Sequence, residues 1–289
     1  MEIASIILAA GKGARLNSAL PKPLHHVGGR PMLAWSLDAA KAAAASRVIT
    51  VLPKDSESII TWLDGRESCI QDSPKGTGHA VIAAKDKLAN FHGVALIMFA
   101  DTPLVTAKTL AALADAVADG RDIAVLGFET NNPTGYGRLV IGADQRLEKI
   151  VEETDATKTE RAITLVNGGV MAVRCPLLFE LLEEVKPDNA KAELYLTDIV
   201  AVANAKDLRV AYRTTDEQEI VGVNSRQDLA YIEAILQDRL RDSAMAQGVT
   251  MRAPKTVFLN ADASFGRDVV IEPHVVIGAG TVIGDGSVI

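Results

Sequence analysis

Two glycines and a cluster of cations follow the first apolar run of the chain. After the run at residues 3–10, residues 11–15 read Gly-Lys-Gly-Ala-Arg, and Lys22 comes soon after. Glycines let the backbone approach a ligand closely with its N–H groups exposed, and lysine and arginine neutralise phosphate oxygens. We therefore expect this turn to hold phosphates.

The charge of the N-terminal segment differs from that of the whole chain. The 289 residues include 30 Lys and Arg against 37 Asp and Glu, for a formal net charge of −7. Within residues 1–30, however, Lys12, Arg15, Lys22 and Arg30 face only Glu2, which leaves a local charge of +3. An acidic chain argues against a general nucleic-acid or anionic membrane partner, so this segment indicates a local anion site.

Two common phosphate-binding motifs do not fit the segment. A dinucleotide fingerprint requires a third glycine where Leu16 stands, which argues against a dinucleotide-dependent oxidoreductase. A Walker loop requires glycine where Ile6 stands and serine or threonine where Gly13 stands. A tight basic turn without a ligand remains the structural alternative.

The composition indicates a folded globular protein. The chain is 48% hydrophobic and long enough for about two domains. Only Cys69 and Cys175 are present, too few for a disulfide framework, so a reducing cytoplasm fits best. The apolar run at residues 3–10 is far shorter than the roughly 20 residues that span a bilayer, so we expect a buried strand and no integral membrane segment.

Short β-branched runs alternate with amphipathic stretches from residue 1 to about residue 225. Alternation of this kind predicts an α/β domain with a mostly parallel sheet, helices on both faces and ligands at the carboxyl ends of the strands. We expect strands at residues 3–10, 48–53, 94–100, 123–128, 164–173 and 208–212. We expect helices at residues 32–45, 80–90, 110–118 and 177–185.

Residues 226–289 follow two other patterns. Residues 226–247 form a charged amphipathic stretch that stops before Gly248, which predicts a helical arm. Beyond it an apolar residue recurs at every sixth position, at Leu259, Phe265, Ile271, Ile277, Ile283 and Ile289. This resembles the hexapeptide repeat of left-handed parallel β-helices, whose coils take three hexapeptides each. We divide the chain into residues 1–225, an arm at 226–250, and a truncated β-helix start at 251–289.

The N-terminal motif is similar to the signature of the sugar-nucleotide pyrophosphorylases, in which L-A-A-G-x-G-x-R is followed by P-K. Here these are residues 8–15 and 21–22. Further family stretches follow in order: Gln71 with G-T-G-H-A at 76–80, F-A-D at 99–101, P-T-G-Y-G-R at 133–138, I-V-E at 150–152, N-G-G at 167–169, Y-L-T-D at 195–198 and G-V-N at 222–224. Together with the hexapeptide start, nearly the whole chain resembles the family of bacterial bifunctional N-acetylglucosamine-1-phosphate uridyltransferases and glucosamine-1-phosphate acetyltransferases. The resemblance implies a Rossmann-like, GT-A-like nucleotidyltransferase domain.

The resemblance also implies roles for residues at matching positions. Arg15 and Lys22 would hold the phosphates, and with Asp101 they would be the catalytic residues. The nucleotide would be bound by Leu8, Ala9, Ala10, Gly11, Lys22, Gln71, Gly76 and Thr77. The amino sugar would be bound by Gly137, Glu152, Asn167 and Thr197.

A metal site is implied in the same way. Asp101 and Asn224 would bind Mg²⁺, a hard cation that takes one or two protein oxygens and completes its octahedron with phosphate and water. The family often reads Tyr-Gly-Asp where this chain has Phe99-Ala100-Asp101, so a methyl group stands beside the metal ligand here.

The implied reaction joins UTP to N-acetylglucosamine-1-phosphate, giving UDP-N-acetylglucosamine and pyrophosphate for cell-wall and lipopolysaccharide precursors in the cytoplasm. The acetyltransferase residues would lie beyond Ile289. Full-length members form homotrimers through the β-helix, and the oligomeric state of this chain stays open. Two alternatives also stay open: a pyrophosphorylase for another sugar phosphate or nucleotide, and a catalytically silent nucleotide-sensing paralogue.

Overall fold

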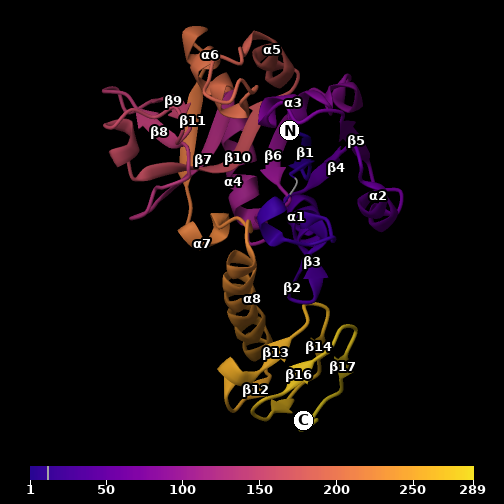
Figure 1. Ribbon diagram of the computed structural model, residues 1–289. Helices are drawn as coiled ribbons and strands as arrows, with labels where there is room; N and C mark the ends of the chain where they lie inside the picture. Colours follow the sequence, from indigo (N-terminus) through magenta and orange to yellow (C-terminus); the bar gives the residue numbers. More distant parts are fainter. Residues whose placement is uncertain (12) are drawn as a thin grey trace.

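A mixed β-sheet forms the centre of the N-terminal part (Figure 1). The computed structural model describes residues 1–11 and 13–289. The strands run in the order β11-β7-β10-β6-β1-β4-β5. Their bounds are β1 (Ile3–Leu8), β4 (Ala45–Pro53), β5 (Ser68–Gln71), β6 (Val94–Phe99), β7 (Ile123–Glu129), β10 (Leu165–Arg174) and β11 (Val210–Thr214). Only β10 runs antiparallel to its neighbours β6 and β7 along this order, which confirms a mostly parallel sheet.

Helices cover both faces of this sheet, as predicted. Ile6 points into a core shared with Leu178 and Ile199, whereas the adjacent Ile7 points into the opposite core with Leu37 and Leu113. Successive strand side chains alternate between faces, so one short strand feeds both cores. The helices are α1 (Met32–Ala42), α2 (Glu57–Leu63), α3 (Thr77–Ile82), α4 (Ala107–Ala118), α5 (Leu177–Glu184), α6 (Ile199–Ala205) and α7 (Glu217–Ile220).

Several short elements were not predicted. Strands β8 (Arg138–Ile141) and β9 (Leu147–Val151) form an antiparallel pair beside β10, and charged residues at exposed positions interrupt the apolar pattern of β9. A two-residue hairpin joins β2 (His26–Val27) to β3 (Arg30–Pro31). The helix expected at residues 80–90 is instead α3 followed by a separate 3₁₀ turn, Lys85–Leu88.

The strand order places a switch point beside β1. The chain passes from β1 to β4 and β5 on one side and then returns to β6 on the other side. In parallel sheets the crevice at such a point, outside the carboxyl ends of the strands, is where ligands bind. Leu8, Gln71 and Phe99 end three of these strands and therefore lie at that edge.

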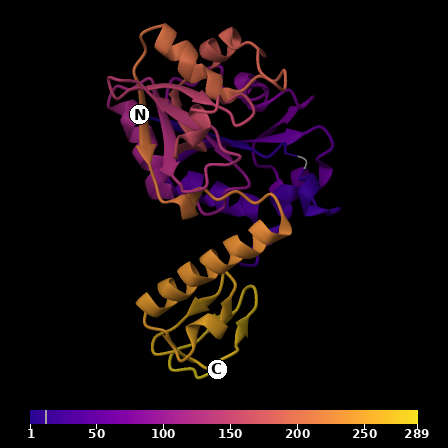
Figure 2. The ribbon, with the colours of Figure 1, turned by 60° about the vertical axis from the view of Figure 1, so that its left-hand side comes forward.

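The long helix α8 (Arg226–Ala246) leads away from the sheet to a small coil of strands (Figures 1 and 2). A capping box between Ser225 and Asp228 starts this helix, and Gly248, with φ +102°, follows its end. The predicted arm is thus a helix over nearly the expected length.

The C-terminal coil has the period that the hexapeptide repeat predicts. Parallel pairing joins Phe258 to Val276 and Ser264 to Val282, residues three hexapeptides apart. Ile271 and Ile277 are buried, as the inward-pointing positions require. The strands are β12 (Thr250–Met251), β13 (Phe258–Leu259), β14 (Ser264–Phe265), β15 (Val270–Ile271), β16 (Val276–Ile277) and β17 (Val282–Ile283). The division at residues 225 and 250 stays a prediction.

Among the described residues, no helix combines the length and apolar character needed to cross a bilayer.

Candidate functional site

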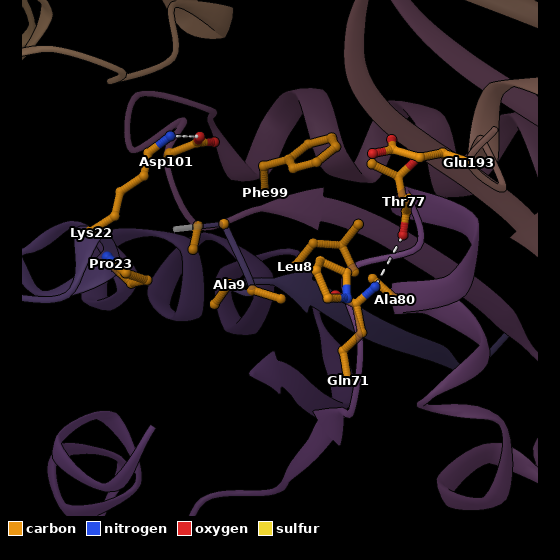
Figure 3. A pocket seen from close by; sticks show the side chains of 15 residues that line it. Leu8, Ala9, Lys22, Pro23, Gln71, Thr77, Ala80, Phe99, Asp101 and Glu193 are labelled. Atoms are coloured by element: carbon orange, nitrogen blue, oxygen red, sulfur yellow. Dashed lines mark hydrogen bonds and ion pairs between the residues drawn. The ribbon is translucent and has the colours of Figure 1, made fainter. Parts of the chain in front are cut away.

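A cavity of about 280 Å³ opens at the carboxyl ends of β1, β5 and β6. Every residue predicted to bind nucleotide lines it, and so does Asp101. Figure 3 shows Lys22 and Asp101 at one end, with Gln71 and Thr77 at the other. The cavity is lined by Leu8, Ala9, Ala10, Gly11, Lys22, Pro23, Gln71, Pro74, Gly76, Thr77, Ala80, Phe99, Ala100, Asp101 and Glu193.

The cationic end of the cavity is built around Lys22. Its ammonium nitrogen lies 2.5 Å from Oδ2 of Asp101 and donates a hydrogen bond of 3.0 Å to Oδ1 of Asn224. Asp101 follows β6, whereas Asn224 immediately precedes α8. The structure thus brings together three predicted site residues from distant parts of the sequence.

Gly13 makes room for the stem of Lys22. A Cβ atom at this position would lie 2.7 Å from Cβ of Lys22, closer than real Cβ contacts allow. Its φ of +62° is also a value that L side chains rarely adopt. Glycine at position 13 is therefore required for the turn to pack against Lys22. The neighbouring Lys12, another residue of the predicted cradle, lies outside the described residues.

Backbone contacts hold the segment of Asn224 against that of Asp101. The N–H of Val223 donates to the carbonyl of Asp101 at 2.8 Å. The N–H groups of Asn224 and Ser225 both donate to Asp228 at 2.8 Å, within the capping box of α8. Since Ser225 is the N-cap, the Asn224 side chain is left to face Lys22.

The opposite end of the cavity presents an amide. Nε2 of Gln71 donates to the carbonyl of Gly76 at 3.1 Å and lies 3.2 Å from Nδ1 of His79. These contacts fix the Gln71 side chain beside the backbone of the Gly76 turn. Gly76 has φ +102°, and a Cβ atom there would lie 2.4 Å from the carbonyl oxygen of Leu194.

The segment at residues 193–196 closes the same end. The N–H of Gly78 donates to the carbonyl of Leu194 at 2.8 Å, and Oγ1 of Thr77 accepts from the N–H of Leu196 at 2.9 Å. Glu193, which lines the cavity, is therefore carried by a segment bonded to the Thr77 turn. Sequence reasoning missed Glu193, although it stands just before the Y-L-T-D motif.

The four residues predicted to bind the amino sugar form a connected group. The N–H of Asn167 donates to the carbonyl of Gly137 at 2.7 Å, and Oγ1 of Thr197 donates to Oε1 of Glu152 at 3.1 Å. A Cβ atom at Gly137 would lie 3.4 Å from both carboxyl oxygens of Glu152. This group does not line the cavity that holds Lys22 and Gln71, but Leu196, next to Thr197, is bonded to the cavity residue Thr77.

Glu152 also lies near two further carboxyl groups, those of Asp155 and Asp198. Burial raises the pKa of Glu152. Burial, with the nearby Glu152 charge, also raises the pKa of Asp198 to about 6. Both residues line a second cavity of about 200 Å³, together with Asp155.

Arg15 is the predicted phosphate residue that the structure does not bring to the cavity. Its side chain is exposed, and it is absent from the cavity lining. It lies in a 3₁₀ turn, Ala14–Leu16, directly after Gly13.

Asp101 and Asn224 fit the predicted magnesium site. One side-chain oxygen of each residue contacts the same cation, the Lys22 ammonium. Two hard oxygen ligands are therefore directed at a single point. Within the described ranges, no group of three or more His, Cys, Asp or Glu is arranged to hold a metal. Mg²⁺ needs no such group, because it takes one or two protein oxygens and fills its other positions with water and phosphate.

Two solved structures share this fold. One is a UDP-glucose pyrophosphorylase complexed with UDP-glucose, with a TM-score of 0.68 at 18% identity over 83% of this chain and 100% of that one. The other is a putative glucose-1-phosphate thymidylyltransferase from Bacillus anthracis, with a TM-score of 0.67 at 19% identity over 82% of this chain and 96% of that one. The likeness confirms the predicted Rossmann-like nucleotidyltransferase fold.

Curated relatives match nearly the whole chain. The bifunctional protein GlmU of Maricaulis maris is 49% identical over 265 residues, 91% of this chain and 59% of the relative. The proteins of the same name from Hyphomonas neptunium and Caulobacter vibrioides are 44% and 43% identical, over 98% and 99% of this chain and 62% and 63% of their own lengths. The chain thus spans about three fifths of the length of these relatives.

The family model for the MobA-like NTP transferase domain matches residues 5–167, more than half of the chain. This range includes the glycine-rich turn, Lys22, the Gln71 segment and Asp101. The chain belongs to the family of MobA-like NTP transferase domain proteins.

Proposed function

We propose that this chain is a uridylyltransferase that joins UTP to N-acetylglucosamine-1-phosphate, releasing pyrophosphate and forming UDP-N-acetylglucosamine. The observation that carries the proposal is the convergence of Lys22, Asp101 and Asn224 at one end of a cavity whose other end holds Gln71 and Thr77. The relatives named GlmU, and a fold neighbour that binds UDP-glucose, support the same reaction class.

The cationic end suits displacement at phosphorus. The sugar phosphate brings an anionic oxygen as the nucleophile, so no side chain has to remove a proton. Catalysis then consists of holding two polyanions in line and stabilising charge on the phosphoryl oxygens. The Lys22 side chain is 9% exposed, so its ammonium supplies a positive charge in a largely water-excluded position, where it would act strongly on the α-phosphate.

Asp101 and Asn224 are the residues that would hold Mg²⁺. When bound, the metal would neutralise phosphate charge and orient the triphosphate. The two side chains arise from loops tied together by the Val223–Asp101 backbone bond. Their spacing is thus set by the protein before any ligand enters.

The other end suits a pyrimidine base. Oε1 of Gln71 can accept a hydrogen bond from an N–H on the edge of uracil, because Nε2 is already held by Gly76 and His79. The glycine turn at Gly76 exposes backbone groups beside that amide. Pairing of polar groups on both partners gives base discrimination, because a wrong base leaves a buried group unpaired.

The connected group at Gly137, Glu152, Asn167 and Thr197 suits the amino sugar. Glu152 offers carboxyl oxygens, Asn167 an amide and Thr197 a hydroxyl, which match the hydroxyl and amide groups of an N-acetylated sugar. The missing side chain at Gly137 leaves space directly against the Glu152 carboxyl.

The proposal also includes the cellular setting and the cofactor. We place the protein in the cytoplasm, in the supply of cell-wall and lipopolysaccharide precursors, with Mg²⁺ as its cofactor. We assign the short β-helix start to the acetyltransferase domain, and to the trimer contact, of the bifunctional uridyltransferases that the chain resembles.

A coupled pyrophosphate assay tests the proposal. We expect pyrophosphate from UTP, N-acetylglucosamine-1-phosphate and Mg²⁺ together, and none after EDTA is added. A panel of other sugar phosphates with UTP, dTTP and GTP identifies a pyrophosphorylase of different selectivity. If the chain binds UTP but releases no pyrophosphate with any of the sugar phosphates, the enzymatic proposal is overturned in favour of a nucleotide sensor.

A further inference from the structure

The 3₁₀ turn that follows the glycines packs on the arm helix. Leu16, the last residue of the Ala14–Leu16 turn, is 1% exposed. Its side chain lies in a cluster with Ile232 and Leu236 of α8 and Val223 of the preceding loop. The end of the predicted phosphate turn is thus anchored outside the central sheet.

Arg226, the first residue of α8, holds the carbonyl of the same leucine. Nε of Arg226 donates to the carbonyl oxygen of Leu16 at 3.0 Å. Carbonyls at the end of a helical turn have no partner within the turn, so this side chain satisfies a group that the turn leaves free. Leu16 is therefore fixed at two points, its side chain and its carbonyl.

The contact between Arg226 and Leu16 connects two segments of the proposed site. Arg226 lies two residues after Asn224, whose side chain contacts Lys22. The contact therefore joins the turn at residues 13–16 to the segment that carries a proposed metal ligand. Gly13, at the other end of the turn, packs directly against Lys22.

A second contact of α8 reaches the segment after Lys22. Oε2 of Glu233 accepts a hydrogen bond from the N–H of Gly28 at 2.7 Å, and a Cβ atom at Gly28 would lie 2.6 Å from Cδ2 of Leu236. The helix thus contacts the chain on both sides of Lys22, at Leu16 and at Gly28.

We infer that Arg226 is a positioning residue for the triphosphate: through the Leu16 carbonyl it sets the turn at residues 13–16 relative to Lys22 and Asn224. The inference rests on the proposed function. Loss of the contact frees the turn that packs against Lys22 through Gly13, and it leaves the sugar group at Glu152 unchanged. The effect is therefore specific to UTP.

The variants Arg226→Ala and Arg226→Lys test this role. We expect Arg226→Ala to raise the KM for UTP roughly tenfold, since a hydrogen bond from a charged donor is lost. The KM for N-acetylglucosamine-1-phosphate should change less than twofold. Arg226→Lys keeps a charged donor and should recover most of the UTP affinity.

Arg239→Ala is the matched control. Arg239 also extends from α8 to a backbone carbonyl, donating from Nη1 to Leu104 at 2.9 Å. We expect it to leave the KM for UTP within twofold. Equal rises in both KM values in Arg226→Ala, or the same rise in Arg239→Ala, would show a general structural role and overturn the inference.

A calorimetric titration with UTP separates this inference from the proposed function. If the wild-type chain releases no pyrophosphate, the proposed function fails, and the titration still compares UTP binding in wild type and Arg226→Ala. We expect the variant to bind UTP roughly tenfold more weakly. Unchanged UTP binding in a folded variant overturns the role of Arg226, whatever the activity of the wild type.

Discussion

The ammonium nitrogen of Lys22 lies 2.5 Å from Oδ2 of Asp101. The lysine side chain is 9% exposed and the aspartate side chain 26% exposed, so the pair lies largely out of water. Asn224 supplies a second oxygen to the same ammonium at 3.0 Å. One cation therefore occupies the point toward which both proposed metal ligands are directed, and binding of a divalent cation there would require the Lys22 ammonium to leave these two oxygens.

Replacement of Lys22 by alanine should reduce pyrophosphate release by roughly a hundredfold or more, because a preorganised charge facing the transferred phosphoryl group is lost. The coupled pyrophosphate assay measures this loss. Lys85→Ala is the control, since Lys85 also pairs with a carboxylate at 2.5 Å, that of Glu183, but at an exposed position. Normal turnover in a folded Lys22→Ala variant would contradict the assignment.

Replacement of Asp101 by alanine should have a similar effect, roughly a hundredfold loss of turnover, because a proposed metal ligand is removed. Asp101→Asn keeps one oxygen and should instead raise the Mg²⁺ concentration needed for half-maximal activity. A Mg²⁺ titration of each variant distinguishes these outcomes. Asp38→Ala, which removes an exposed partner of Arg30, should leave the Mg²⁺ requirement unchanged. An unaltered Mg²⁺ requirement in both Asp101 variants would count against this metal site.

The sequence predicts the inner strands of the central sheet well because they are buried on both faces, whereas the half-buried edge strand β5 is not among the expected strands. Continuous apolar runs such as those of β1 and β6 have few alternative placements. In contrast, β9 carries Glu148 and Lys149 at exposed positions, and its pairing with β8 depends on distant contacts. The local sequence pattern therefore does not predict this strand.

The site residues likewise include some that local sequence signals predict and some that only distant contacts place. The glycine-rich motif and the strand-end aspartate are local signals, and the cavity lining at Gly11, Lys22 and Asp101 follows them. Glu193 enters the cavity because backbone hydrogen bonds join the adjacent Leu194 to Lys75 and Gly78, a contact that no local pattern encodes. The placement of Arg15 outside the cavity depends on the path of the turn, which the motif alone does not define.

Replacement of Gly76 by alanine should destabilise the protein by about 1–3 kcal/mol, because φ is +102° and the new Cβ would lie 2.4 Å from the Leu194 carbonyl oxygen. Displacing Leu194 would also disturb the segment that carries Glu193, so UTP affinity should fall. Denaturant unfolding and a UTP titration measure the two effects. Gly284→Ala is the control, since a Cβ atom there meets nothing within 4 Å. Equal stability of the two variants would show that the Gly76 turn adapts.

The buried carboxyl of Asp198 should make stability depend on pH. Burial, and then the Glu152 charge, raises the pKa of Asp198 from 3.8 to about 6, so the folded state favours the protonated form. The stabilising contribution is complete below about pH 4 and is lost as the pH rises through about 6. Asp198→Asn stays neutral throughout, so its Tm should exceed that of the wild type at pH 7 by more than it does at pH 4. Calorimetric scans between pH 4 and 8 measure this difference, and Asp242→Asn on the exposed side of α8 is the control. A Tm difference for Asp198→Asn that is constant over this range would show that folding does not raise the pKa of Asp198.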